Sequence, residues 1–272
     1  MRIVAAALLL TAHPQMALAD CQPVDFMTFP MFQSGDPIEA ALEAAYPGSD
    51  LNSAAGTFTT PKGTVIPYAP ARDTGPAARL ENATLGDMFT YVYPLDFDLT
   101  ARREAWFDPG RVRNDAFFAA MYFDTETEVR ASLQRVDFAG ETRQASFYVT
   151  TKNCVSTQLA AALEQIETLS PGIDIYFENS GGSFNWRVVA GTDRMSSHSF
   201  GTAIDINTEL GGFWRWTGAS EGQITDYDNK IPKEVVQAME RFGFIWGGKW
   251  NNFDGMHFEY RPELILYSRL AD

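Results

Sequence analysis

The chain is poor in histidine, cysteine and basic residues. Among 272 residues there are three histidines, two cysteines and 21 lysines and arginines, against 35 aspartates and glutamates. The formal net charge of −14 argues against a nucleic-acid partner, because phosphate binding needs a basic face. The two cysteines lack the spacing of a cysteine-ligated metal site, and no internal repeat or low-complexity tract is present.

Long apolar runs are also missing. Beyond the first 19 residues, no stretch approaches the ~20 apolar residues of a membrane span. The N-terminus itself has a basic start at Arg2, an apolar run from Ile3 to Ala12 and a small-x-small site at Ala17-Leu-Ala19. This pattern predicts a signal peptide over 1–19 and an exported protein, periplasmic or extracellular. The alternatives are a buried N-terminal helix and a lipoprotein anchored at Cys21, which Asp20 directly before it disfavours.

The two cysteines are Cys21 and Cys154. An even count in an exported chain is consistent with one disulfide, which would tie the mature N-terminus to the start of a central helix and add about 2–4 kcal/mol of stability. Two unpaired thiols are the alternative.

The fold class that the pattern favours is α+β, a small antiparallel sheet with packed helices and a metal site in a cleft on the sheet. Residues 20–104 are punctuated by Pro and Gly and predict an irregular N-terminal region that wraps a core, with partial disorder over 48–80 as the alternative. One helix is expected there after Pro37, with Asp36 as N-cap.

Residues 105–272 carry clearer periodicity. The apolar spacing predicts helices over 115–121, 126–133, 155–169 and 232–242. Alternation predicts strands over 134–140, 142–151, 173–177, 202–207, 244–246 and 257–260, and an extended segment at 91–97.

The scarcity of histidine makes the two that remain informative. His13 leaves with the signal peptide, so the mature chain keeps only His198 and His257. With Asp205 they can form a three-ligand zinc site with an open fourth position. Asp254, three residues before His257, is then placed to act as base on a zinc-activated water. A hydrogen-bonded histidine pair without a metal is the alternative.

These residues also carry a family resemblance. Ser196-Ser-His198-Ser-Phe-Gly201-Thr-Ala203-Ile-Asp205 resembles the Ser-x-His-x-x-Gly-x-Ala-x-Asp signature of the zinc D-Ala-D-Ala carboxypeptidase and L-alanyl-D-glutamate endopeptidase family of peptidoglycan peptidases. The runs 244–250 and 254–259 resemble that family's closing Gly-Phe-x-Trp-Gly-Gly and acid-x-x-His motifs. The resemblance is firm over 180–265 and loose over 105–179, so a zinc peptidase domain is expected at 105–272.

The resemblance implies a role for each matched position. His198, Asp205 and His257 match the zinc ligands and Asp254 the catalytic base. Arg187 matches the basic residue that polarises the substrate carbonyl.

Other residues near the motifs suggest supporting roles. Ser196 is a candidate to hydrogen-bond substrate or orient His198, and Trp250 is a candidate substrate-binding wall. Arg111 and Arg113 could reach the site to bind a carboxylate. Glu259 and Asn207 fit supports of the ligands better than ligands.

The implied activity is hydrolysis of peptidoglycan stem peptides by a Zn²⁺ enzyme. Aspartate at 254 favours the L-Ala-D-Glu endopeptidase type. The alternatives are a D-Ala-D-Ala carboxypeptidase on the same scaffold and a non-catalytic zinc module that binds wall peptides.

Overall fold

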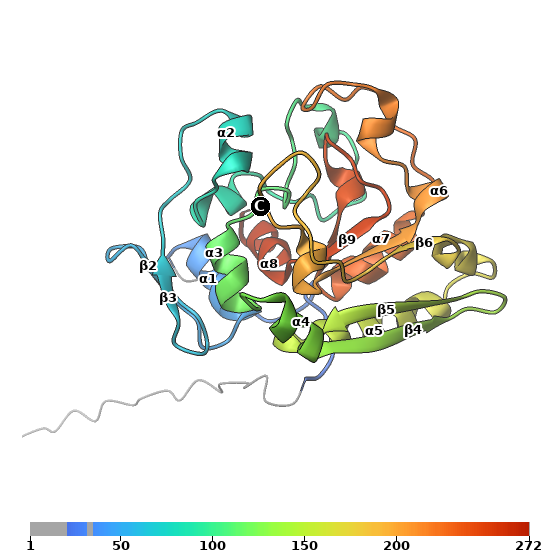
Figure 1. Ribbon diagram of the computed structural model, residues 1–272, viewed down its shortest axis with the longest axis horizontal. Coiled ribbons are helices and arrows are strands. Elements are labelled where there is room, and N and C mark those ends of the chain that lie inside the picture. Colours follow the sequence, from blue (N-terminus) through green and yellow to red (C-terminus); the bar gives the residue numbers. More distant parts are fainter. Residues whose placement is uncertain (1–20, 32–34, 272) are drawn as a thin grey trace, which may run out of the picture.

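The structure, a computed structural model, describes residues 21–31 and 35–271 (Figure 1). The expected signal peptide over 1–19 lies outside the described residues. Within them, no helix has the length and apolar character needed to cross a bilayer.

The described chain combines helices with three separate antiparallel sheets, which confirms the α+β class. The helices are α1 Pro37–Ala45, α2 Pro76–Glu81, α3 Asp115–Met121, α4 Glu126–Ser132, α5 Val155–Glu167, α6 Thr208–Gly211, α7 Lys233–Arg241 and α8 Pro262–Ala271. The strands are β1 Asp50–Asn52, β2 Thr57–Thr59, β3 Val65–Pro67, β4 Leu133–Ala139, β5 Gln144–Thr150, β6 Ser180–Gly182, β7 Ala203–Asn207, β8 Phe244–Trp246 and β9 His257–Tyr260.

The sheet that positions the candidate site has the order β6-β7-β9-β8, with every neighbouring pair antiparallel. Ile204 of β7 lies opposite Phe258 of β9, and both side chains are fully buried in the core. The next pair along the same two strands is Asp205 opposite His257. Since successive side chains alternate between the faces of a sheet, the apolar pair fixes the polar pair on the other face.

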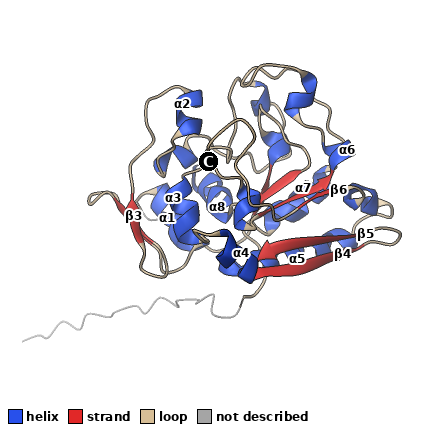
Figure 2. Cartoon of the chain, in the orientation of Figure 1, coloured by secondary structure: helices blue, strands red, loops and turns tan. Residues whose placement is uncertain are grey.

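Helix α5 lies between the β4–β5 hairpin and α7 (Figure 1). Its apolar stripe, which includes Leu159, Ala162, Leu163 and Ile166, is buried as the spacing predicts. Figure 2 shows that the strands are short and that loops and short helices make up most of the upper part of the view.

Residues 21–104 hold more regular structure than the sequence predicted. Helix α1 begins after Asp36, whose side chain accepts a hydrogen bond from the Ile38 amide as expected of an N-cap. It packs against α8, and β1, β2 and β3 form a separate three-stranded sheet. One hydrophobic cluster contains residues of this region and of 105–272 alike. The boundary at 104/105 stays a prediction.

Two sequence predictions need correction. Ile173–Phe177, predicted as a strand, is a 3₁₀ helix that follows Gly172 at φ +85°. The Asp174 carboxylate accepts hydrogen bonds from the backbone amides of Thr142 and Arg143. It thereby holds the segment against the turn of the β4–β5 hairpin.

The segment 91–97, predicted as extended, is a loop without a strand. The Tyr93 amide donates to the Ser268 hydroxyl, and the Tyr93 hydroxyl accepts from the Trp246 amide and donates to Glu240. These bonds to side chains replace the ladder that a strand would need.

Cys21 and Cys154 form a disulfide. The bridge links the start of the described chain to the residue before α5, where the sequence placed it, across a separation of 133 residues.

Candidate metal centre

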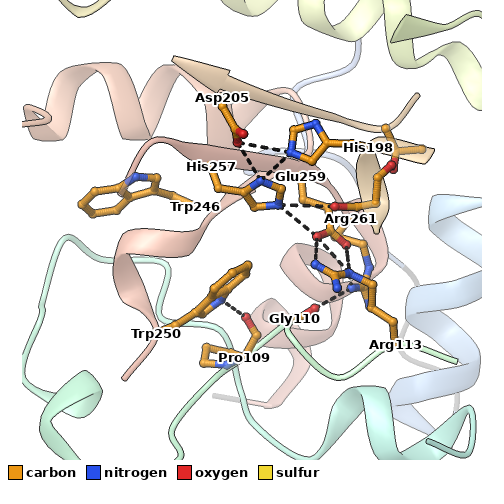
Figure 3. Close-up of polar contacts among 12 residues, drawn as sticks. Pro109, Gly110, Arg113, His198, Asp205, Trp246, Trp250, His257, Glu259 and Arg261 are labelled. Atoms are coloured by element: carbon orange, nitrogen blue, oxygen red, sulfur yellow. Dashed lines mark hydrogen bonds and ion pairs between the residues drawn. The ribbon is translucent and has the colours of Figure 1, made fainter. Parts of the chain in front are cut away.

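Three side chains from one loop and two strands converge at one point (Figure 3). Asp205 comes from β7 and His257 from β9, brought together by their direct pairing. His198 comes from the 3₁₀ turn Ser197–Phe200, which ends at Gly201 with φ +67°. The left-handed conformation of Gly201 turns the chain directly from His198 into β7.

The facing atoms lie at the separations that a small metal ion requires. His257 Nδ1 lies 2.9 Å from Asp205 Oδ1, and His198 Nε2 lies 3.3 Å from the same oxygen. The two ring nitrogens are 3.2 Å apart. Two ligands of a tetrahedral zinc, each at ~2.0–2.1 Å, are separated by about 3.3 Å. The three atoms are therefore spaced so that they could hold a zinc ion.

Each imidazole is held by a partner on its other nitrogen. His198 Nδ1 lies 2.5 Å from the Ser183 carbonyl oxygen, so it is the N–H that donates there. His257 Nε2 lies 3.3 Å from Glu259 Oε2 and 3.4 Å from the Ser197 hydroxyl. A histidine ligand in proteins has this kind of second contact, which fixes the ring and leaves the other nitrogen free for the metal.

Glu259 is itself fixed by buried cations. Arg113 donates to both of its oxygens at 2.6–3.1 Å, and Arg261 Nη1 donates at 3.2 Å. Burial alone would raise the pKa of the Glu259 carboxyl, but the charge of Arg113 and the bond from His257 outweigh it and hold the pKa well below its usual range. Glu259 is therefore an anion beside His257, the supporting role that the sequence suggested.

Electrostatics keep a proton on His257 before a metal binds. Burial lowers the pKa of the imidazole, yet its hydrogen bonds to Asp205 and Glu259 raise it to about 10. Burial would raise the pKa of Asp205, but the charges and hydrogen bonds of the two histidines lower it well below its usual range. His257 thus donates a proton to the Asp205 carboxylate, and a metal cation could take the place of that proton.

Asp254 is buried close enough to this group for the charges of Asp205 and both histidines to act on its carboxyl. Its Oδ1 is buried without a hydrogen-bond partner in the described residues. Burial, and then the negative charge of Asp205, raise the pKa of this carboxyl to about 7. Its backbone forms a bridge with Phe213 and accepts from the His257 amide. A carboxyl with a pKa near neutrality and a free oxygen is suited to move a proton.

A close glycine contact positions the Asp254–His257 turn. A Cβ on Gly255 would lie 1.8 Å from the carbonyl oxygen of Gly211, the last residue of α6. The Gly255 carbonyl accepts from the Trp246 indole at 2.8 Å. Only glycine lets α6 approach the turn this closely.

The other predicted residues lie in different settings. The Ser196 side chain is 4% exposed and forms no hydrogen bond within the described part of the chain. Trp250 is 3% exposed, donates from its indole to the Pro109 carbonyl, and has its ring 5.7 Å from that of His257. This burial leaves little of its surface for a substrate and places it as a packing neighbour of His257.

Arg187 is exposed. Its side chain forms one weak hydrogen bond, at 3.5 Å, to the carbonyl of Val188. Its backbone is anchored, because the Arg187 amide donates to the Ser199 hydroxyl, which in turn donates to the Arg187 carbonyl. The loop is thus fixed next to the turn that carries His198.

Two further predictions have a different outcome. Asn207, expected to support a ligand, instead accepts from the Glu209 and Leu210 amides and caps α6. Arg111, expected at a substrate carboxylate, pairs with Asp108 and Glu221 at 3.0 and 2.5 Å.

Sequence reasoning missed Ser183, Ser197 and Arg194. Ser183 acts through its backbone carbonyl, which any residue type would supply, so no sequence signal marks it. Ser197 could have been found as the residue between Ser196 and His198. Arg194 stands out because its buried Nε has no hydrogen-bond partner among the described residues, which the sequence does not show.

Comparison with curated proteins and with solved structures found no match. Residues 190–260 match a family model described as D-alanyl-D-alanine carboxypeptidase, a zinc peptidase family. The matched segment contains His198, Asp205, Asp254 and His257, and it confirms the resemblance that these motifs suggested.

Proposed function

We propose that this chain is an exported zinc peptidase that hydrolyses peptidoglycan stem peptides, of the L-Ala-D-Glu endopeptidase type. The observation that carries the proposal is the set of three facing atoms at 2.9–3.3 Å beside a buried carboxyl with an unpartnered oxygen. A metal alone could serve structure, but a structural site has no use for an unpartnered acid beside it. The family match and the disulfide support peptide substrates and export.

In this proposal His198 Nε2, Asp205 Oδ1 and His257 Nδ1 hold the ion. Zinc bound there supplies a Lewis acid that polarises the scissile carbonyl and lowers the pKa of water. Asp254 takes a proton from the attacking water at Oδ1 and passes it to the leaving amine, so water adds across the C–N bond.

The remaining predicted residues have proposed roles around this centre. Arg187 stabilises the negative charge that develops on the carbonyl oxygen, and its exposure allows the side chain to swing toward a bound peptide. The unpartnered Ser196 hydroxyl hydrogen-bonds the substrate backbone. Trp250 keeps the ring of His257 in place.

One observation favours a second function, carboxypeptidase action on terminal D-Ala. The description of the matched family names that activity.

The test is a digest of defined tripeptide, tetrapeptide and pentapeptide muropeptides by residues 20–272 loaded with zinc, with and without chelator, read by mass spectrometry. Chelator-sensitive release of a stem peptide that begins with Glu supports the endopeptidase, and release of terminal D-Ala supports the carboxypeptidase. Asp254→Asn is the matched control and should hold zinc while losing turnover. Absence of any mass change in the zinc-loaded wild type contradicts both.

A further inference from the structure

Arg194 is a buried cation whose guanidinium has no partner in the described part of the chain. The residue is 7% exposed, and its Nε has no hydrogen-bond partner among the described residues. Across the described residues, no ion pair or hydrogen bond involves its guanidinium. Its backbone is fixed, because its carbonyl accepts from the Val189 amide at 2.8 Å and its amide donates to the Thr192 hydroxyl at 3.2 Å. An arginine buried in this way is costly unless a ligand supplies the missing anion.

The charges around Arg194 leave it in a positive environment. Burial, and then the positive charges of Arg113 and Arg111, lower the pKa of Arg194 to about 10, so it stays charged at neutral pH. The nearby acids Glu81 and Glu221 oppose this effect only in part. Glu221 already pairs with Arg111 at 2.5 Å.

Asp115, at the start of α3, senses the charges of both Arg113 and Arg194. Burial nevertheless raises the pKa of this carboxyl, and it forms no ion pair with either arginine in the described structure. No carboxylate of the described chain therefore neutralises Arg194 directly.

This cationic group is close to the candidate metal centre in sequence and through the ion pair of Arg113. Arg194 is two residues before Ser196 and four before His198, in a segment held by the Val188–Met195 bridge. Arg113 bonds Glu259, which bonds His257. The positive charge of Arg111 is felt at Asp254, where it opposes the effect of burial. Arg113 thus contacts a support of His257, Arg111 acts on the candidate base, and the charges of both act on Arg194.

We propose that Arg194 binds a carboxylate of the substrate peptide and makes the enzyme select acidic stem peptides. The inference rests on the proposed function and names the feature of the substrate that the site selects. A planar guanidinium with free N–H donors matches a carboxylate in a bidentate pair. Arg111 and Arg113 are already paired, so they contribute positive electrostatic potential rather than direct hydrogen bonds to the substrate carboxylate. The carboxylate is either the C-terminal one, as on terminal D-Ala, or one within the stem, as on D-Glu.

The experiment uses the zinc-loaded enzyme and peptides in matched sets, in which the C-terminal or the internal carboxylate is a free acid or a carboxamide. The wild type should cleave one acid form about 10- to 100-fold better in kcat/KM than its amide. Arg194→Met should cleave acid and amide alike at the rate of the wild type on the amide. The position at which the carboxamide lowers kcat/KM shows whether Arg194 binds the C-terminal or the internal carboxylate.

A second readout does not depend on turnover. Asp254→Asn binds but should not hydrolyse, so calorimetry can compare acid and amide binding to this variant with and without Arg194→Met. Arg194→Met should abolish the preference and raise the melting temperature, since it removes an unpaired buried charge. Arg135→Met, at a side chain 58% exposed on the β4–β5 hairpin, is the matched control.

The outcomes separate the two proposals. A wild type that cleaves acid and amide equally overturns the carboxylate site while the peptidase stands. Discrimination that persists in Arg194→Met, or a melting temperature that falls as for a structural arginine, also overturns it. No cleavage of any peptide overturns the peptidase itself.

Discussion

The buried carboxyl of Asp254 should make the stability of the protein depend on pH in a way that one substitution removes. The pKa of this group is raised from 3.8 to about 7 in the folded chain, by burial first and then by Asp205. The folded state therefore binds a proton that the unfolded state has lost. Stability from this group is full below the unfolded pKa and declines as pH rises toward the folded pKa.

The difference between the two pKa values corresponds to at most about 4 kcal/mol. In Asp254→Asn, which cannot ionise, that decline should be absent. Measured in urea with chelator present, the gap in unfolding free energy between variant and wild type should widen by up to about 4 kcal/mol between roughly pH 4 and pH 7, and then level off.

Asp228→Asn is the control, because its side chain is 81% exposed and should leave the pH dependence as in the wild type. A gap that is constant across this range refutes the reasoning. It would mean that Asp254 titrates in the folded chain as it does in water, through a partner or a solvent path that the structure does not show.

Three further predictions follow from the same contacts. Zinc binding near pH 7 should release about one proton from His257, because its bonds to Asp205 and Glu259 raise its pKa to about 10 against the effect of burial. Calorimetry in buffers of different ionisation enthalpy measures this proton release, and a binding heat that is the same in all buffers contradicts the prediction. Glu259→Gln should weaken zinc binding about 10- to 100-fold in a competition titration, because it alters the contact to His257. The control Glu234→Gln, on the exposed face of α7, should bind zinc as the wild type does. Equal zinc affinities of Glu259→Gln and the wild type would show that the Glu259 contact is dispensable. Cys21→Ser should lower the free energy of unfolding by about 2–5 kcal/mol and leave the zinc content unchanged. A reducing agent should have the same effect on the wild type. An unchanged midpoint of urea unfolding would count against a stabilising disulfide.

The helices and strands that the sequence predicted well are those whose pattern is set by burial on one face. Helix α5 and strand β7 are examples, since Leu159 and Ile204 lie in continuous apolar stripes that the sequence displays directly. The failures lie where a side chain from elsewhere captures the backbone. Tyr93 bonds residues about 150 or more positions away, and no local pattern records such a partner.

The same distinction applies to the site. The grouping of His198, Asp205 and His257 could be predicted because the sequence has few histidines, and His198 and His257 each lie near an aspartate. The sequence could not predict which ring nitrogen of each histidine faces the candidate metal position. That orientation depends on Ser183 and Glu259, which contact the other nitrogen of each ring. Arg194 was missed for a related reason: its importance lies in the absence of a partner, which only the packed structure reveals.

The N-terminal region helps to position the candidate metal site. Buried charges alternate from His257 through Glu259 and Arg261 to Glu263, which is fully buried. The last member of the series accepts a hydrogen bond at 2.8 Å from the hydroxyl of Tyr46, the residue directly after α1. A buried ion series of this kind is stable only when every member keeps its partners. Docking of α1 on α8 thus fixes Glu263, which fixes Arg261, which helps to fix the carboxylate behind His257. A chain cut to residues 105–272 would leave Glu263 buried without that donor, so residues 21–104 help to position the candidate metal ligands as well as cover the core.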